Sequence, residues 1–340
     1  PDGWLQDEPR ASYTRGEVPF ALVPDWSATR RRACGGLAFG DADHDGDLDL
    51  AVGTYFANQY PPLEDYYNYI YLNSGGALSE PPGWISADQK HTGDVFWKDL
   101  NGDSFPDLFV GNGGEALSGS QVFYGHDGLL PTTAGWTSAT SVWLVDADPA
   151  DFDRDGDIDV ATANQGRSSD PYRPTLLFRN DGTGLETTPF WSSAQVGITN
   201  SCDWADMDGD SYPELAVAGW VNWQSGVFQN LGSTLSTGFV WTTGHPERTD
   251  KGIGWTDFDG DGREDLCVGG NGDPDWLFRN EGSMLGALPV WSSGESYNGC
   301  QELAWADVDA DGDEDLATAH FSTGHVRIYL NEGGSFASVA

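Results

Sequence analysis

Short apolar runs separated by polar turns recur along this chain. In residues 252–293 the runs read GIGWTD, DLCVGG, DWLFRN and LPVWSS. Each run is too short for a helix, is rich in Val, Leu and aromatic residues, and is bounded by Gly, Asn and Asp. The pattern therefore predicts four short β-strands in this unit, and an all-β protein.

The unit recurs six times, and each copy carries an acidic stretch followed later by a Trp. The acidic stretches start 50 to 58 residues apart, a period typical of solenoids, propellers and arrays. Four antiparallel strands per unit, repeated radially, form a β-propeller. The acidic stretches begin at Asp41, Asp99, Asp151, Asp206, Asp257 and Asp307, and the recurring tryptophans are Trp26, Trp84, Trp136, Trp191, Trp241 and Trp291.

The two ends of the chain predict how the ring closes. The segment FALVPDWSATR (20–30) matches the fourth run of a unit, whereas VRIYLNEGG (326–334) matches the third. An N-terminal strand would therefore complete the last blade and cover two exposed sheet edges. We expect a single domain over 1–340: a six-bladed propeller of four-stranded blades, preceded by an N-terminal extension at 1–19.

The acidic stretches follow the spacing D-x-D-x-D-G-x-x-D, which predicts calcium loops. Side chains at positions 1, 3, 5 and 9, with the backbone carbonyl of position 7, can converge on Ca²⁺, which takes 6–8 oxygen ligands. Gly at position 6 permits the sharp turn. The predicted ligands are Asp41, Asp43, Asp45, Asp47 and Asp49 in loop 41–49; Asp99, Asn101, Asp103, Phe105 and Asp107 in loop 99–107; Asp151, Asp153, Asp155, Asp157 and Asp159 in loop 151–159; Asp206, Asp208, Asp210, Tyr212 and Glu214 in loop 206–214; Asp257, Asp259, Asp261, Arg263 and Asp265 in loop 257–265; and Asp307, Asp309, Asp311, Asp313 and Asp315 in loop 307–315.

These loops differ from an EF-hand and from one another. An EF-hand needs Glu at position 12 between two helices, but position 12 of the first loop is Val52, inside a predicted strand. Loop 99–107 has Asn101 at position 3, so we expect it to bind calcium most weakly. Acidic surface turns would explain one such loop, but six copies in register favour up to six structural calcium ions.

The stretch AFGDADHDGDLDLAVG (38–53) resembles the FG-GAP/VCBS repeats of integrin α-like calcium-binding propellers. The resemblance covers all six repeats, from about residue 20 to the end. It implies a calcium loop between the first and second strands of each blade, which matches the order of the runs. Integrin propellers have seven blades, of which only some carry calcium, so the resemblance does not transfer integrin-like partner binding to this chain.

Charge and cysteines set expectations for compartment and partners. The formal charge of -38 disfavours nucleic acid and anionic membranes as partners, and no apolar run is long enough to cross a bilayer. Cys34 with Cys300, in units adjacent across the ring closure, and Cys202 with Cys267, in adjacent units, are candidate disulfides; four buried thiols are the alternative. Disulfides and weak calcium sites both suit an extracellular, cell-surface or periplasmic setting.

The loops opposite the acidic loops vary most between units, so we expect a ligand to bind there. The candidate ligand-binding residues are Arg30, Arg31, Arg32, Trp220, Trp223, His320 and His325, although each set could serve packing or charge balance instead. No familiar catalytic motif is present. We expect a recognition or adhesion module for a glycan or extracellular protein, acting as a monomer or within a larger surface protein. The alternatives are a lyase-like enzyme on acidic polysaccharide, or a structural module without a ligand.

Overall fold

The computed structural model contains strands and turns but no helix among the residues it describes. Those residues are 26–29, 33–55, 66–114, 118–128, 130–166, 169, 172–220, 223–294, 299–321 and 325–336. Within them, no helix exists that could span a membrane. The all-β prediction is therefore confirmed.

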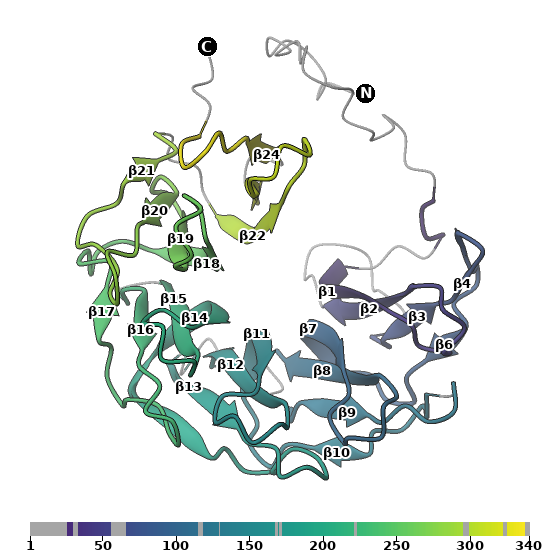
Figure 1. Ribbon diagram of the computed structural model, residues 1–340. Coiled ribbons are helices and arrows are strands. Elements are labelled where there is room, and N and C mark those ends of the chain that lie inside the picture. The colour runs from purple at the N-terminus through teal and green to yellow at the C-terminus, as the bar shows by residue number, and fades with distance from the viewer. Residues whose placement is uncertain are drawn as a thin grey trace.

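Small antiparallel sheets lie side by side around a common axis, in a propeller-like arrangement (Figure 1). The first sheet comprises β1 (Ala33–Gly40), β2 (Asp49–Tyr55), β3 (Tyr69–Tyr71) and β6 (Trp84–Ile85), and the hairpin β4 (Asn73–Ser74) with β5 (Ala77–Leu78) lies beside it. The second comprises β7 (His91–Lys98), β8 (Asp107–Gly113), β9 (Gln121–Phe123) and β10 (Trp136–Thr137).

The third sheet has seven strands because β14 runs without a break through 15 residues. Its first part pairs with β13, as in Trp191 opposite Leu177, and its second part pairs with β15, as in Trp204 opposite Leu215. The sheet comprises β11 (Trp143–Ala150), β12 (Asp159–Gln165), β13 (Arg173–Phe178), β14 (Trp191–Ala205), β15 (Glu214–Trp220), β16 (Gly226–Phe228) and β17 (Trp241–Thr242).

The last two sheets have four and three strands. They comprise β18 (Asp250–Thr256), β19 (Asp265–Gly270), β20 (Trp276–Phe278) and β21 (Trp291–Ser292), followed by β22 (Cys300–Ala306), β23 (Asp315–His320) and β24 (His325–Tyr329). The sequence predicts six separate four-stranded sheets. In the described part of the chain, three sheets have four strands. Most of the segment predicted to close the ring, 20–25 and 30, lies outside the described residues.

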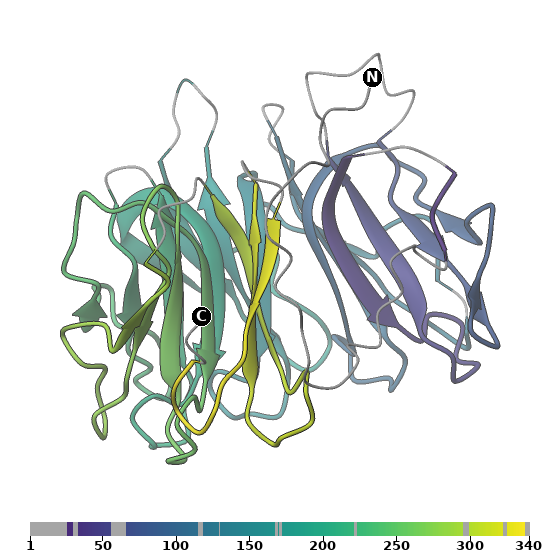
Figure 2. The ribbon, with the colours of Figure 1, turned by 90° about the horizontal axis from the view of Figure 1, so that it is seen from above.

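The innermost strands β1, β7, β11, β14, β18 and β22 face the axis (Figure 1), and each carries a bulge at the same point. A bulge places one extra residue in a strand and bends it, which re-aims the side chains beside it. The bulged residues are Gly35, Gly93, Val145, Asn200, Lys251 and Gln301. Seen from the side, the strands of the sheets run in roughly one direction, with loops gathered at the two ends (Figure 2).

The recurring tryptophans pack between neighbouring repeats, as their spacing predicts. Trp191, for example, meets Phe228 edge-on with ring centroids 5.1 Å apart. Such edge-to-face aromatic pairs add stability beyond the apolar area they bury. The equivalent pairs are Trp26–Tyr71, Trp84–Phe123, Trp136–Phe178, Trp241–Phe278 and Trp291–Tyr329.

Candidate metal loops and an axial pocket

Each acidic loop joins the first and second strands of its sheet and wraps around its own first carboxylate. In loop 41–49, the backbone N–H groups of Asp45 and Gly46 donate to the Asp41 carboxylate over 2.9 and 3.1 Å. The N–H of Asp47 donates to Oδ1 of Asp45 over 2.9 Å. All three bonds recur in loops 99–107, 257–265 and 307–315, and the bonds from positions 6 and 7 recur in loops 151–159 and 206–214. Hydrogen bonds within the loop therefore hold the carboxylates of positions 1 and 5 on one side.

The tight turn needs left-handed backbone at two positions, whereas the spacing predicted only one. Position 6 has positive φ in Gly46 (93°) and also in Ser104 (72°) and Ser211 (75°). Position 4 is left-handed as well, as in His44 (63°). Non-glycine residues tolerate this conformation only with strain. The glycines at position 4 of loops two and four, Gly102 and Gly209, therefore relieve strain in the loops that lack Gly at position 6.

The position-9 carboxylate is buried and ties its loop to the third strand. Oδ2 of Asp159 accepts the N–H of Phe152 at 3.1 Å, and Oδ1 accepts the N–H of Asn180 at 2.8 Å. Asp49, Asp107, Glu214 and Asp315 accept equivalent pairs of bonds. Burial raises the pKa of Asp107, Asp159 and Glu214 to about 7, and that of Asp265 to about 6.

Several carboxylate oxygens in these loops converge without a protein partner. In loop 41–49, one oxygen from each of Asp41, Asp43 and Asp45 lies within 4.8 Å of the others. Positions 1, 3 and 5 converge in the same way in loops 206–214 and 257–265, and positions 1, 3 and 9 converge in loop 151–159. Four oxygens at positions 1 and 3 are buried and accept no hydrogen bond from the described residues: Oδ1 of Asp43, Asp151, Asp153 and Asp259. Buried acceptors without donors are costly, and a hard cation fits this all-oxygen set.

An asparagine after the third strand connects four of the loops to the following repeat. Asn230 Nδ2 donates to the carbonyl of Phe152, the second residue of the preceding loop, over 2.8 Å. Asn180, Asn280 and Asn331 make the same bond to Leu100, Met207 and Phe258. These four loops are thus held against the neighbouring repeat, so an ion bound in one of them would stabilise a contact between repeats.

Comparison with protein families identifies this repeated loop-and-strand unit. The family model described as an FG-GAP-like repeat matches residues 99–162, 151–217 and 257–318, together more than half of the chain. The chain belongs to the FG-GAP-like repeat family. No curated protein matches it significantly.

At the opposite end of the FG-GAP repeats, the innermost strands surround a pocket of about 600 Å³ on the axis. It is lined where the first strands begin and the second strands end, which is the end that carries the variable loops. Tyr55, Trp143, Trp220 and Phe321 contribute aromatic surface. Lys251 lies over the Trp220 ring with Nζ 5.1 Å from its centroid.

Carboxyl groups from different FG-GAP repeats gather at this axis, a proximity that sequence analysis did not predict. They are Asp94, Asp146, Asp148, Asp203 and Glu302, of which Asp94, Asp146 and Glu302 line the pocket. Each aspartate accepts the backbone N–H of a residue on the next innermost strand, as Asp146 does from Cys202 at 2.8 Å. In the sequence, an acidic residue recurs on the first strand of several repeats. This recurrence is the signal that could have predicted the axial carboxyls.

Burial and mutual repulsion raise the pKa of these axial carboxyls. Burial, then the charge of Asp203, raises the pKa of Asp148 to about 9. Burial raises the pKa of Asp203 to about 6, and Asp148 and Asp203 hydrogen-bond to each other. Burial, then the charge of Asp146, raises the pKa of Glu302 to about 7. Two carboxyls this close share a proton more readily than they both ionise.

We expect Asp148→Asn to stabilise the protein at pH 8 and to leave it unchanged at pH 4. Because the folded-state pKa of Asp148 is raised to about 9, the folded state binds more protons than the unfolded state between about pH 4 and 9. Stability falls as pH rises through that window. Asn accepts the Trp204 N–H without the charge, so the gain at pH 8 should be at least about 1.4 kcal/mol, the equivalent of one pKa unit.

Urea unfolding at both pH values measures this gain, with the exposed residue Asp127 changed to Asn as the control. A D148N protein less stable than the unmodified chain at pH 8 would show that the ionised Asp148 stabilises the axis.

The structure separates the ligand-binding candidates. Trp220 lines the axial pocket, whereas Trp223 packs against Gly197 and the Phe239 ring, away from it. His320 is 5% exposed, so its assignment to a ligand surface is wrong. His325 begins β24, but its side chain lies outside the described residues, as do Arg30, Arg31 and Arg32.

Neither predicted disulfide forms, since all four cysteines carry thiols in the structure. Cys202 packs against strand β11 of the repeat before it, with Sγ 4.0 Å from the Asp146 carbonyl oxygen, whereas Cys267 packs with Cys300 toward the last sheet. Cys34 lines the pocket, whereas Cys300 faces Asp275 and His320. The residues of each predicted pair therefore point to different interfaces, which position along the chain does not reveal.

Proposed function

We propose that this FG-GAP chain is an extracellular or periplasmic, calcium-stabilised recognition module that binds a glycan in its axial pocket. The observation that carries the proposal is the pocket itself, because ligand sites are typically concave, largely apolar and supplied with a few convergent polar groups. The pocket opens among the variable loops and combines aromatic surface with carboxylates and amides.

We propose further that the ring has six blades. The continuous strand β14 would count as the outer strand of one blade and the inner strand of the next, as its two sets of partners support. Trp26 meets Tyr71 with ring centroids 5.0 Å apart, as the fourth-strand tryptophan of a preceding blade does in five other places. The segment that carries Trp26 would then complete the β22–β24 sheet.

Apolar residues on the two sheets that would meet support this closure. Leu37 on β1 is 60% exposed and Ile328 on β24 is 39% exposed. Their counterparts at the same register in the other five repeats are all buried, as Val95 and Leu277 illustrate. Phe39 on β1 is also exposed, at 64%. Burying these three side chains between the first and last blades supplies the hydrophobic stabilisation that the other interfaces have.

Calcium in the acidic loops is the second part of the proposal. The converging carboxylates, the buried oxygens without donors and the turn that brings positions 1, 3 and 5 together support a hard divalent ion in each loop. The ion would offset the repulsion between carboxylates and brace the contact that each asparagine makes with the neighbouring repeat. The position-7 carbonyls would complete the ligand set.

The pocket favours a neutral or amino sugar over an acidic one. Sugar rings can stack on Trp220 and Trp143, and their hydroxyls can donate to Asp94, Asp146 and Glu302. Those of the three carboxyls that are ionised would repel a carboxylate or sulfate on the ligand. This argues against a lyase on acidic polysaccharide, as does the burial of His320.

We expect a Trp220→Ala variant to bind the glycan at least tenfold more weakly, because the variant loses one stacking surface, and tenfold equals about 1.4 kcal/mol. Binding of calcium-loaded protein to neutral, amino and acidic oligosaccharides measures this, with product formation monitored in the same samples. Trp223→Ala is the matched control, since Trp223 lies outside the pocket lining.

Failure of every oligosaccharide to bind would overturn the recognition function. Equal weakening by both substitutions, or by neither, would place the ligand elsewhere on the molecule. New reducing or unsaturated ends would make the protein an enzyme.

A further inference from the structure

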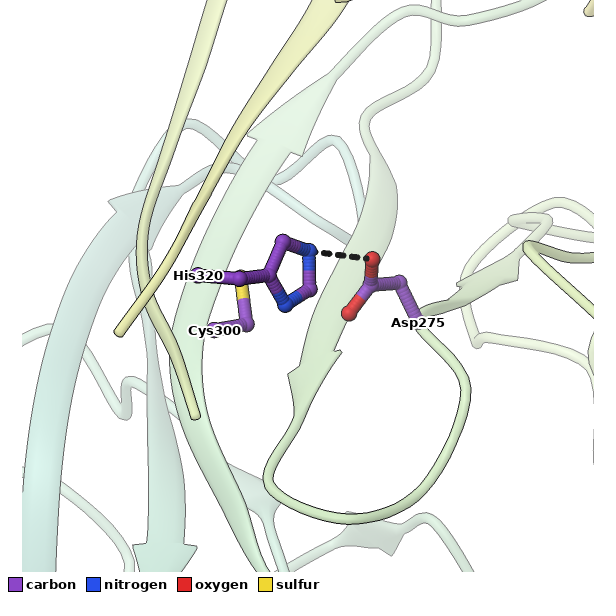
Figure 3. A group of neighbouring side chains, drawn as sticks. All are labelled: Asp275, Cys300 and His320. Atoms are coloured by element: carbon purple, nitrogen blue, oxygen red, sulfur yellow. Dashed lines mark ion pairs between the residues drawn. The ribbon is translucent and has the colours of Figure 1, made fainter. Parts of the chain in front are cut away.

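Three side chains with metal-binding groups meet between the last two sheets, far from the acidic loops (Figure 3). Cys300 begins β22 and pairs in register with His320 at the end of β23, so the sheet itself places them together. Asp275 comes from the neighbouring sheet, directly before β20. One potential ligand atom from each residue lies within 4.8 Å of the others.

The cluster is almost completely buried and its ligand atoms are already oriented. Asp275, Cys300 and His320 are 1%, 0% and 5% exposed. Nε2 of His320 lies 3.4 Å from Oδ2 of Asp275 and 3.1 Å from Oγ1 of Thr318, and Oδ1 of Asp275 accepts the N–H of Gly270 at 3.0 Å. Neither the mechanism of the loops nor the proposed glycan site uses these groups.

The chemistry of these ligands differs from that of the acidic loops. Thiolate and imidazole ligands suit Zn²⁺ and similar ions, whereas calcium requires oxygen. Tetrahedral zinc with ligand distances of about 2.0–2.3 Å holds its ligand atoms roughly 3.3–3.8 Å apart. The 3.4 Å between Nε2 of His320 and Oδ2 of Asp275 already fits this spacing. The separations from Sγ of Cys300 are at most 4.8 Å, so they need to shorten by no more than about 1.3 Å.

Charge balance supports an ion at this buried place. A divalent ion with the Cys300 thiolate, the Asp275 carboxylate and neutral His320 forms a group with no net charge. The nearby guanidinium of Arg248 is separately paired with Asp250, with Nε 2.5 Å from Oδ1. Neutral groups avoid the large free-energy cost of burying an isolated charge.

A second buried cysteine lies beside the cluster. Cys267 on β19 is fully buried and packs in the same hydrophobic cluster as Cys300. Gly269, two residues further along β19 and therefore on the same face, lies directly under Cys300, since a Cβ there would come 2.5 Å from Sγ of Cys300. The three converging ligand atoms come from Asp275, Cys300 and His320 alone.

We propose that Asp275, Cys300 and His320 bind one zinc ion that fastens the three-stranded β22–β24 sheet to the β18–β21 sheet. The ion would bridge a sheet that has only three strands in the described part of the chain to its four-stranded neighbour. The site is structural, because its burial leaves no access for a substrate.

The first test counts zinc in the full chain. Protein is produced with zinc under reducing conditions, exchanged into calcium-containing buffer so that the acidic loops hold calcium, and analysed for bound metal. We expect one zinc per chain. Replacing zinc by cobalt should give the sulfur-to-cobalt charge-transfer absorption that only a thiolate ligand produces. A wild-type protein that retains no zinc, or whose cobalt form lacks this absorption, overturns the proposal without relying on any variant.

The second test uses variants to distinguish the loss of a zinc ligand from the general effect of replacing a buried thiol. Cys300→Ser and His320→Asn should each bind zinc at least about a hundredfold more weakly, because each loses a direct ligand. Cys202→Ser is the matched control, since Cys202 is also buried but packs at another interface. Undiminished zinc binding by C300S, or equal loss in C202S, would contradict the assignment.

Discussion

A chelator that strips calcium from this protein should lower its melting temperature by about 20 °C. Each ion that binds only the folded state stabilises it by roughly 2.7 kcal/mol at a hundredfold excess over its dissociation constant. Six such sites would contribute about 16 kcal/mol, and a chain of 340 residues has an unfolding entropy near 0.7 kcal/mol/K. Thermal melts with and without chelator, followed by added calcium, measure the effect.

The reason for so large an effect is the charge of the loops. The chain has a formal charge of -38, which six divalent ions would change to -26, and the change is concentrated where carboxylates lie together. Added calcium should restore the melt, whereas added magnesium should restore little, because Mg²⁺ demands a smaller octahedral site. Asp153→Asn, which alters one loop only, should reproduce a small part of the loss. A melting temperature that does not change when the chelator is added would contradict the structural-calcium proposal.

The second large effect concerns the aromatic pairs between repeats. Trp191→Ala should destabilise the protein by about 3–5 kcal/mol, as large-to-small core substitutions do. Trp191→Phe is the control, because Nε1 of Trp191 has no hydrogen-bond partner among the described residues and the ring contact with Phe228 survives. In contrast, Trp241→Phe should cost more than Trp191→Phe, because Nε1 of Trp241 donates to the Gly286 carbonyl over 3.1 Å. Urea unfolding measures all three.

The same measurement tests whether the ring has six blades. If the segment that carries Trp26 completes the last blade, Trp26→Ala should cost about as much as Trp191→Ala, since both rings fill equivalent interfaces. If that segment merely lies against the first sheet, Trp26→Ala should cost well under 1 kcal/mol, as surface substitutions do. The comparison between the two variants decides the blade count without any assumption about absolute stability.

Features within one repeat could be predicted from the sequence because neighbouring residues are enough to form them. The strands follow from short apolar runs between Gly, Asn and Asp, and the acidic loops follow from nine consecutive residues that turn on themselves. The family was recognisable for the same reason, since the unit returns six times in register. The hydrogen bonds of Asp41 and Asp45 stay inside their loop, so the spacing alone could indicate the turn.

Features between repeats required the tertiary structure, because they depend on how sheets face one another. Trp220 and Trp223 are three residues apart, yet only Trp220 lines the pocket, because β15 ends at Trp220 on the axial side. The axial carboxyls come from separate strands. Asp275 meets Cys300 and His320 only because the β18–β21 sheet packs against the β22–β24 sheet. The disulfide predictions were wrong because they used only the order of the repeats. That order predicts which repeats are neighbours, whereas the packing of the sheets determines the direction in which each cysteine side chain points.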